Sequence, residues 1–204
     1  YPFAVIKALA SNRTVVLMNM DNISIGSLSF DCLSPKAYAN SVRAILRKHG
    51  IRNKVTVFGH SFGSITAGWF LKYFPECVEH AILVDPVSVL LGLPNVAMNF
   101  LYRTPSTLME WVIYIFASTE ITIAHTLYRH FTWHHNIVWL DELSEEISVT
   151  VLACGADDIL SGPAVHCYAG HHAEAGSQAS NRGKSYVESI PEADGCEIVS
   201  NTRK

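Results

Sequence analysis

The sequence predicts an α/β fold built on a mostly parallel, doubly wound sheet, with helices on both of its faces. Short apolar runs rich in β-branched residues are typical of buried parallel strands, and they occur at 14–20, 55–58, 81–84 and 148–154. Segments with helical spacing or with helix start and stop signals separate the first three of these runs. Strands and helices therefore alternate along the chain, which is the pattern of a parallel sheet.

The first half of the chain supplies most of these elements. Apolar residues at helical spacing predict a short helix over 2–10. Ser34-Pro35 is a helix-start signal, with a capping residue followed by proline at the first helical position. The helix that begins there is expected to end at His49-Gly50. A further helix follows the run at 55–58 and is stopped by Pro75.

The second half begins with a long aromatic segment that has helical character and no strand-like alternation. Because this segment lies between two predicted core strands, we interpret residues 88–147 as a helical cap inserted into a core formed by 1–87 and 148–175. A helix is expected from Gly162 to about residue 175. The polar tail over 176–204 contains one possible last strand at 196–199.

Composition restricts the class of protein. Of the 204 residues, 49% are hydrophobic and 16% are charged, which suits one globular domain with a buried core. The net charge of −3 gives no electrostatic reason to expect a nucleic-acid partner. The five cysteines are odd in number, scattered and without a CxxC pair, so we expect no disulfide framework and no zinc site among them, and a reducing, cytoplasmic compartment. We expect no cofactor.

The most apolar stretch, 108–124, is interrupted by Glu110 and Glu120. It is therefore shorter than the ~20 apolar residues that a membrane-spanning helix needs. We interpret it as part of the cap and expect no transmembrane span.

The pattern Gly59-x-Ser61-x-Gly63 stands directly between a predicted strand and a predicted helix. A nucleophilic serine in this position stands on a tight, strained turn. The flanking glycines are expected because a side chain at either position would clash with the backbone. The helix that follows directs its N-terminal amides at the reacting centre, and the N–H of Phe62 is the expected oxyanion-hole donor.

Three segments carry a resemblance to the α/β-hydrolase family. Residues 54–75 (KVTVFGHSFGSITAGWFLKYFP) resemble its nucleophile region, and the strand that ends in Asp85-Pro86 resembles the next core strand. Residues 149–160 (VTVLACGADDIL) resemble the strand that presents the catalytic acid. The resemblance covers about 2–175 and implies a serine hydrolase whose triad runs serine, acid, histidine along the chain.

The resemblance also suggests the acid. In the family it commonly lies in a Gly-x-x-Asp turn after its strand, which here selects Asp158. Its neighbour Asp157 is the alternative, with helix capping or solvation as its ordinary role. Asp85 is a second alternative, because some family members place the acid after the strand that follows the serine. The ordinary role of Asp85 is that of a turn residue before proline.

The catalytic histidine is not identified. In the family it lies in the loop after the last strand, and no histidine follows 196–199 before Lys204. His60 lies inside the motif, too close to Ser61 in sequence to act as its base.

Three other histidines follow Asp158, namely His166, His171 and His172. They fall in the helix predicted over 162–175, which in the family precedes the last strand. We therefore interpret them as residues of a helix face.

A second histidine cluster, His130, His134 and His135, lies in the predicted cap. His130 and His134 have the i, i+4 spacing of zinc-binding helices. Phe131 stands beside His130 where the HExxH motif has glutamate. We therefore predict no metal site and interpret these residues as part of the cap surface.

The family landmarks suggest that the chain is an internal part of a longer hydrolase. The second oxyanion donor comes from the loop before the first core helix, which would precede Tyr1. A central strand is also missing between those expected at 14–20 and 55–58. We expect a hydrolase that acts on an apolar ester, thioester or lipid-like substrate through a Ser61 acyl-enzyme, with weak activity in this chain alone. The alternative is a non-catalytic pseudo-hydrolase that binds a small apolar ligand or a protein partner.

Overall fold

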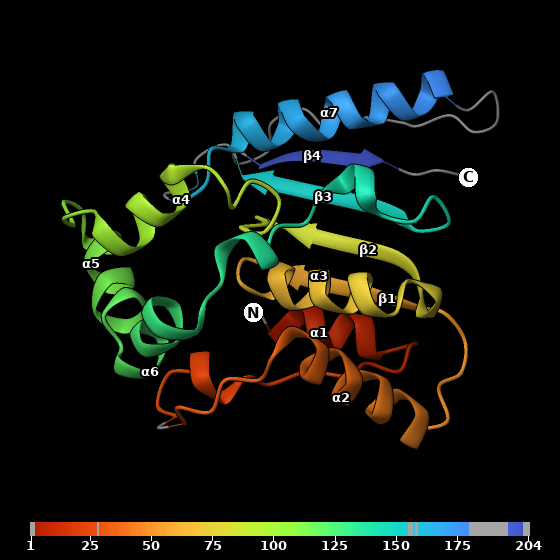
Figure 1. Ribbon diagram of the computed structural model, residues 1–204, viewed down its shortest axis with the longest axis horizontal. Helices are drawn as coiled ribbons and strands as arrows, with labels where there is room; N and C mark the ends of the chain where they lie inside the picture. The colour runs from red at the N-terminus through yellow and green to blue at the C-terminus, as the bar shows by residue number, and fades with distance from the viewer. Residues whose placement is uncertain (1–2, 28, 155–156, 158, 180–195, 202–204) are drawn as a thin grey trace.

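The computed structural model describes residues 3–27, 29–154, 157, 159–179 and 196–201. Within these residues four strands form one sheet in the order β1-β2-β3-β4 (Figure 1). The first three strands are parallel, and the fourth is antiparallel to its neighbour. The predicted α/β class with a mostly parallel sheet is therefore confirmed.

Three of the predicted apolar runs form strands of this sheet. The strands are β1 (Val55–His60), β2 (Val78–Val84), β3 (Ser148–Cys154) and β4 (Cys196–Asn201). In the parallel part, His60 of β1 pairs with Val84 of β2, and Val84 pairs with Leu152 of β3. The carboxyl ends of these three strands therefore lie side by side.

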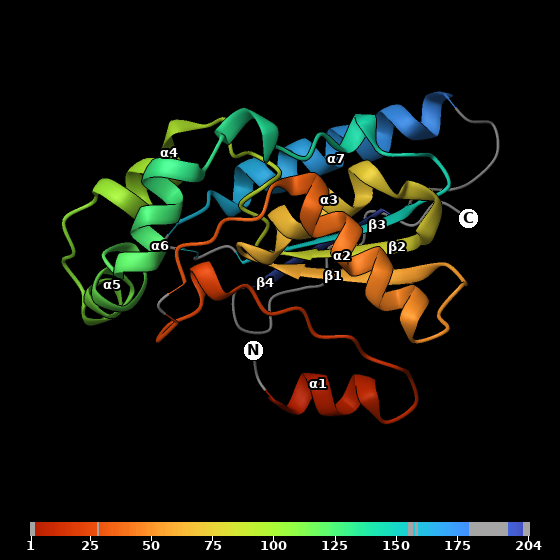
Figure 2. The same cartoon turned by 60° about the horizontal axis from the view of Figure 1, so that its bottom comes forward.

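Four longer helices accompany the sheet, namely α1 (Phe3–Ala10), α2 (Pro35–Lys48), α3 (Gly63–Tyr73) and α7 (Gly162–Ala179). Helices α2, α3 and α7 lie on one face of the sheet, and α1 lies on the other side, set apart from the strands (Figures 1 and 2). A helix therefore lies on each side of the sheet, but α1 stands apart from the strands and does not cover the second face as a doubly wound sheet would require. Helix α7 extends a few residues beyond its predicted end.

Helix α2 begins and ends where the sequence signals place it. The side chain of Ser34 accepts a hydrogen bond from the Ala37 N–H at 3.3 Å, and Pro35 is the first helical residue. Gly50 adopts a φ of +72° just after the helix, a conformation that glycine reaches without a steric penalty.

The hydrophobic core lies on one face of the sheet. Helix α3 is buried along most of its length, and its Phe70 and Leu71 share a core with Leu83 of β2 and Val151 of β3. The opposite face is only partly covered, because Phe58 of β1 is 42% exposed. The double-sided burial typical of parallel strands is therefore not reached in the described part of the chain.

The strand predicted at 14–20 is wrong. This segment forms no strand and no helix. Val16 instead packs against the main core, and Met18 and Met20 pack against a second apolar cluster near α3. Leu17 is 67% exposed. The apolar run is therefore explained by packing of this segment against the core, without a neighbouring strand to pair with.

The segment between β2 and β3 is a series of short helices. It lies beyond the carboxyl ends of β1, β2 and β3 (Figure 1). Its α-helices are α4 (Pro94–Ala97), α5 (Leu108–Ile113) and α6 (Ile121–His125). Each is continued by a wider π-helical turn, η3 (Met98–Tyr102), η4 (Tyr114–Ser118) and η5 (Thr126–His130) respectively.

The two glutamates that interrupt the apolar stretch cap helices in this segment. Thr107 and Glu110 form a reciprocal capping box at the start of α5. Glu120 accepts hydrogen bonds from the N–H groups of Thr122 and Ile123 at the start of α6. The apolar stretch is thus divided between separate short helices. No helix among the described residues has the length and apolar character needed to cross a membrane.

Candidate active site

The turn at Ser61 joins the end of β1 to the start of α3. Ser61 has a φ of +49°, which is uncommon for any residue other than glycine. Its N–H donates to the Val84 carbonyl at 2.9 Å, so the parallel ladder continues one residue past the strand. A residue held in this region stores about 1–3 kcal/mol of strain. This is the strained strand-to-helix turn that the motif predicts.

Gly59 is required by the closeness of the turn. A Cβ atom at Gly59 would lie 2.6 Å from the Gly63 carbonyl oxygen and 2.9 Å from the Cα of Ser64. A Cβ at Gly63 would meet no atom within 4 Å. The expected clash is therefore confirmed at Gly59 and wrong at Gly63, because the first residue of α3 faces open space.

Hydrogen bonds of the Ser64 side chain hold the turn in place. Ser64 Oγ donates to the Ser61 carbonyl at 2.6 Å and accepts from the Ser88 N–H at 3.2 Å. Ser64 is fully buried. The turn is thereby tied to the segment that follows β2.

Phe62 lies between Ser61 and the first residue of α3. Its backbone is right-handed helical, so its amide belongs to the group of N–H donors at the helix N-terminus. Its ring lies 6.1 Å, centroid to centroid, from that of Phe131. Phe131 in turn contacts Trp133 edge to face. The segment after η5 therefore packs directly against the serine turn.

Asp85 follows β2 and joins the ends of all three parallel strands. It has a φ of +42°. Its Oδ1 accepts from the Cys154 N–H at 2.8 Å, and its own N–H donates to Leu152 at 2.7 Å. Its Oδ2 lies 3.8 Å from His60 Nε2. Burial lowers the pKa of His60, and the negative charge of Asp85 partly opposes that shift.

Asp157 acts as a local cap. Its Oδ1 accepts from the N–H groups of Ile159 and Leu160, both at 2.7 Å. Helix capping is the ordinary role that the sequence suggests for Asp157 as the alternative to catalysis. Asp158, the predicted acid, lies outside the described residues.

Hydrogen bonding at Ser61 does not single out any one of the described histidines. No described histidine donates or accepts a hydrogen bond at Ser61. His80 Nε2 bonds Thr150 Oγ1 across the sheet at 2.8 Å. His166 and His171 lie on α7, as predicted. The side chain of His172 is outside the described structure.

A small hollow lies between the helical segment and the chain that follows β3. Its empty volume is about 300 Å³, part of which is open solvent, and its lining includes Asn99, Tyr114 and Ile159. An ion pair between Arg103 and Glu110 stands in its wall. Ser61 is not part of this lining.

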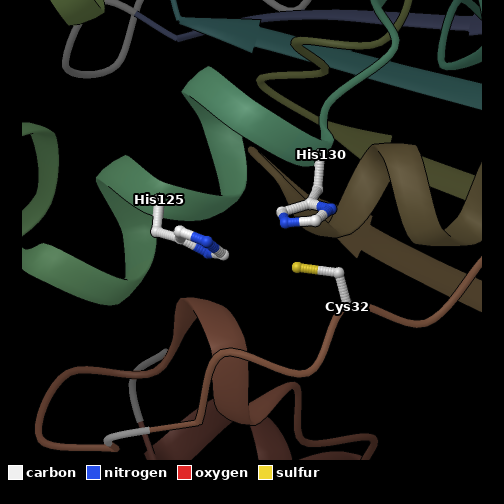
Figure 3. Close-up of side chains that lie close together, drawn as sticks. All are labelled: Cys32, His125 and His130. Carbon is white, nitrogen blue, oxygen red and sulfur yellow. The ribbon is translucent and has the colours of Figure 1, made fainter.

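The histidines of the helical segment are arranged differently from the zinc-helix spacing. The helical turn η5 ends at His130, and His134 lies in a separate 3₁₀ turn, η6 (Trp133–His135). Ligand atoms of Cys32, His125 and His130 instead come within 4.8 Å of one another (Figure 3). Sequence analysis missed this group, because Cys32 is remote in sequence and His125 has no i, i+4 partner.

Comparison with known families identifies the superfamily of the chain. A family model described as the alpha/beta hydrolase fold matches residues 1–138, well over half of the chain. The chain belongs to the α/β-hydrolase family. In this α/β hydrolase the matched range contains the Ser61 turn and Asp85, and it stops before β3. Neither the curated proteins nor the solved structures gave a match.

Proposed function

We propose that this α/β hydrolase is a serine hydrolase that cleaves an ester, thioester or lipid-like substrate through an acyl-enzyme at Ser61. The supporting observation is the strained conformation of Ser61 behind a glycine that cannot carry a side chain. A protein that only binds ligands has no need of such a turn, whereas a nucleophile gains exposure above the sheet from it.

The reaction follows from the groups around the turn. Ser61 Oγ attacks the substrate carbonyl carbon, and its proton passes to a base. The carbonyl oxygen becomes an oxyanion that accepts a hydrogen bond from the Phe62 N–H at the start of α3. The base passes the proton from Ser61 to the departing alcohol or thiol, and then takes a proton from the water that attacks the acyl-enzyme and returns it to Ser61 Oγ as the acid product leaves. The rings of Phe62 and Phe131 favour an apolar acyl or alcohol group.

We propose Asp158 as the acid of the triad. The neighbouring carboxylate of Asp157 is engaged by two backbone N–H groups, and that of Asp85 by the Cys154 N–H. These bonds support structural roles for Asp157 and Asp85. Since no described histidine bonds to Ser61, we expect slow turnover: removing a triad member leaves only about 10³–10⁴-fold catalysis over water.

Covalent labelling of the 204-residue chain tests the nucleophile. A fluorophosphonate probe should attach to Ser61, as located by peptide mass spectrometry, and the Ser61→Ala variant should not be labelled. Ser41→Ala is the matched control, because Ser41 lies exposed on α2. Added imidazole should speed the labelling of the unsubstituted chain by acting as an external base. Labelling that persists in Ser61→Ala would exclude this role.

The alternative is a pseudo-hydrolase that binds a small apolar ligand or a protein partner. It is favoured by the lack of a described histidine at Ser61. In that case the probe should leave Ser61 unmodified even with imidazole, while an apolar fluorescent dye should bind saturably and equally well to Ser61→Ala. Labelling of Ser61 would exclude the purely non-catalytic alternative.

A further inference from the structure

Cys32, His125 and His130 bring three metal-binding side chains to one place. Cys32 lies in the loop between η1 (Asp21–Ile23) and α2, His125 ends α6 and His130 ends η5. Their ligand atoms all lie within 4.8 Å of one another. Figure 3 shows the sulfur of Cys32 and the two rings directed toward a common space.

The π-helical turn explains how two histidines five positions apart meet. In an α-helix, residues i and i+5 lie about 140° apart around the axis, at 3.6 residues per turn. The wider turn of η5, with its i to i+5 hydrogen bonding, brings His125 and His130 to the same side. Their ring centroids are 4.7 Å apart. Single π-helical turns of this kind are frequent at functional sites.

The ring of His125 carries a buried nitrogen without a partner. Its Nδ1 is inaccessible to solvent and makes no hydrogen bond. A buried polar atom left without a partner destabilises the folded protein. Coordination of a cation by this nitrogen would remove that cost.

The sulfur of Cys32 has two buried polar neighbours, of which Asn22 is a hydrogen-bond donor to it. Asn22 Nδ2 donates to it at 3.7 Å, and Thr126 Oγ1 lies 3.6 Å from it. Asn22 and Thr126 are both buried, and Asn22 Nδ2 also donates to Thr126 Oγ1 at 3.2 Å. Groups that donate to a ligand sulfur and fix its position are characteristic of metal sites, where they tune affinity.

We propose that Cys32, His125 and His130 bind one Zn²⁺ ion. A thiolate and two imidazoles suit Zn²⁺, whereas Ca²⁺ and Mg²⁺ require oxygen ligands. Tetrahedral zinc, with bonds of about 2.0–2.3 Å, holds its ligand atoms roughly 3.5 Å apart. The three side chains therefore need to close by about an ångström, a movement that side-chain rotation allows. Water would complete the four ligands.

Zinc at this place would link two distant parts of the chain. Cys32 and Thr126, the first residue of η5, are 94 positions apart in the sequence. The ion would therefore cross-link the loop before α2 to the helical segment. His130 adjoins Phe131, which packs on Phe62 at the serine turn. The ion would thus stabilise the packing beside Ser61.

Metal titration tests the site independently of hydrolysis. Tag-free, chelator-treated chain should bind one equivalent of Zn²⁺ in competition with a chromophoric chelator, and Zn²⁺ should raise its melting temperature. His130→Ala should weaken binding by about 100-fold or more, since losing even an outer-shell partner costs 10–100-fold. His130 is exposed, so this variant is expected to fold, as circular dichroism would check.

Cobalt substitution identifies the sulfur ligand. Co²⁺ should produce a thiolate-to-metal charge-transfer band that disappears in Cys32→Ser. Cys167→Ser and His134→Ala are the matched controls, because both residues are exposed and lie outside the cluster, and neither should change the band or the stoichiometry. No binding by the unsubstituted chain, or equal binding by folded His130→Ala, would overturn the proposal. So would loss of binding in His134→Ala.

Discussion

Ser61 and Asp85 are the two described residues other than glycine that adopt a positive φ. They follow neighbouring strands, and the Ser61 N–H bonds the carbonyl of Val84, immediately before Asp85. Backbone strain is thus concentrated at the carboxyl ends of β1 and β2. Strain of this kind persists only where surrounding contacts impose it, and it occurs often at active sites.

At the residue scale, replacing each of the two glycines of the serine turn by alanine should change the free energy of unfolding by very different amounts. Gly59→Ala should lower the free energy of unfolding by about 3 kcal/mol or more, because its Cβ would meet the Gly63 and Ser64 backbone, which cannot rotate away. Gly63→Ala is the matched control and should change stability by less than about 1 kcal/mol, since alanine favours the helix. Urea denaturation measures both, and equal losses would show that the turn is not closely packed at Gly59.

At the element scale, α2 depends on a single side-chain cap. Ser34→Ala removes the acceptor for the Ala37 N–H and should destabilise the protein by about 1 kcal/mol. Ser41→Ala lies within the same helix, where Ser41 Oγ only bonds back to the Ala37 carbonyl, and it should change stability by less than about 0.5 kcal/mol. Thermal unfolding of the pair separates the cap from a general effect of losing a hydroxyl. A Ser34→Ala variant as stable as Ser41→Ala would contradict the capping role.

The short helices between β2 and β3 follow a repeated plan. Each α-helix is followed at once by a π-helical turn, and α5 and α6 each begin with a glutamate-assisted cap. The caps can be seen in the sequence as Thr107-x-x-Glu110 and as Glu120. The π-helical turns have no such signal, and they decide which side chains share a face.

At the scale of the whole molecule, a buried hydrogen bond joins α3 to the chain after η6. Trp69 Nε1 donates to Asn136 Oδ1 at 2.7 Å, and both residues are buried. Close by, Gly68 leaves room for Val138, whose Cγ2 would lie 2.4 Å from a Cβ at that position. These contacts hold the helical segment against the helix that carries the serine turn.

Breaking this hydrogen bond should weaken the entire fold. Asn136→Ala leaves the Trp69 N–H buried without a partner and should cost about 1–3 kcal/mol. Asn95→Ala, at an exposed position of α4, is the control and should cost less than about 0.5 kcal/mol. Urea denaturation followed by tryptophan fluorescence measures both variants. Equal midpoints would mean that the Trp69–Asn136 bond contributes nothing to the stability of the fold.

The strands β1, β2 and β3 could be predicted because a buried strand leaves a continuous apolar run. The same rule failed at 14–20, where Val16, Met18 and Met20 pack inward from a segment that pairs with no strand. An apolar run records that side chains are buried, and it does not record whether a neighbouring strand is present to complete a ladder.

In the candidate site, too, some features could be predicted from the local sequence and others depend on the tertiary structure. The Ser61 turn was predictable because its glycine, strand and helix signals lie within a few consecutive residues. The capping bonds of Asp157 and the cross-strand bond of Asp85 depend on where β2 and β3 end in space. The acid was therefore selected only by resemblance, and Asp158 stays a prediction.

By itself the sequence determined the α/β class, the serine turn and the start of α2, since each depends on interactions between residues close together in the chain. The tertiary structure alone decided that the core lies on one face of the sheet, that 14–20 is unpaired, and that Cys32 meets His125 and His130. Those features arise from contacts between residues far apart in sequence and from a π-helical turn. Neither leaves a local pattern of residue types.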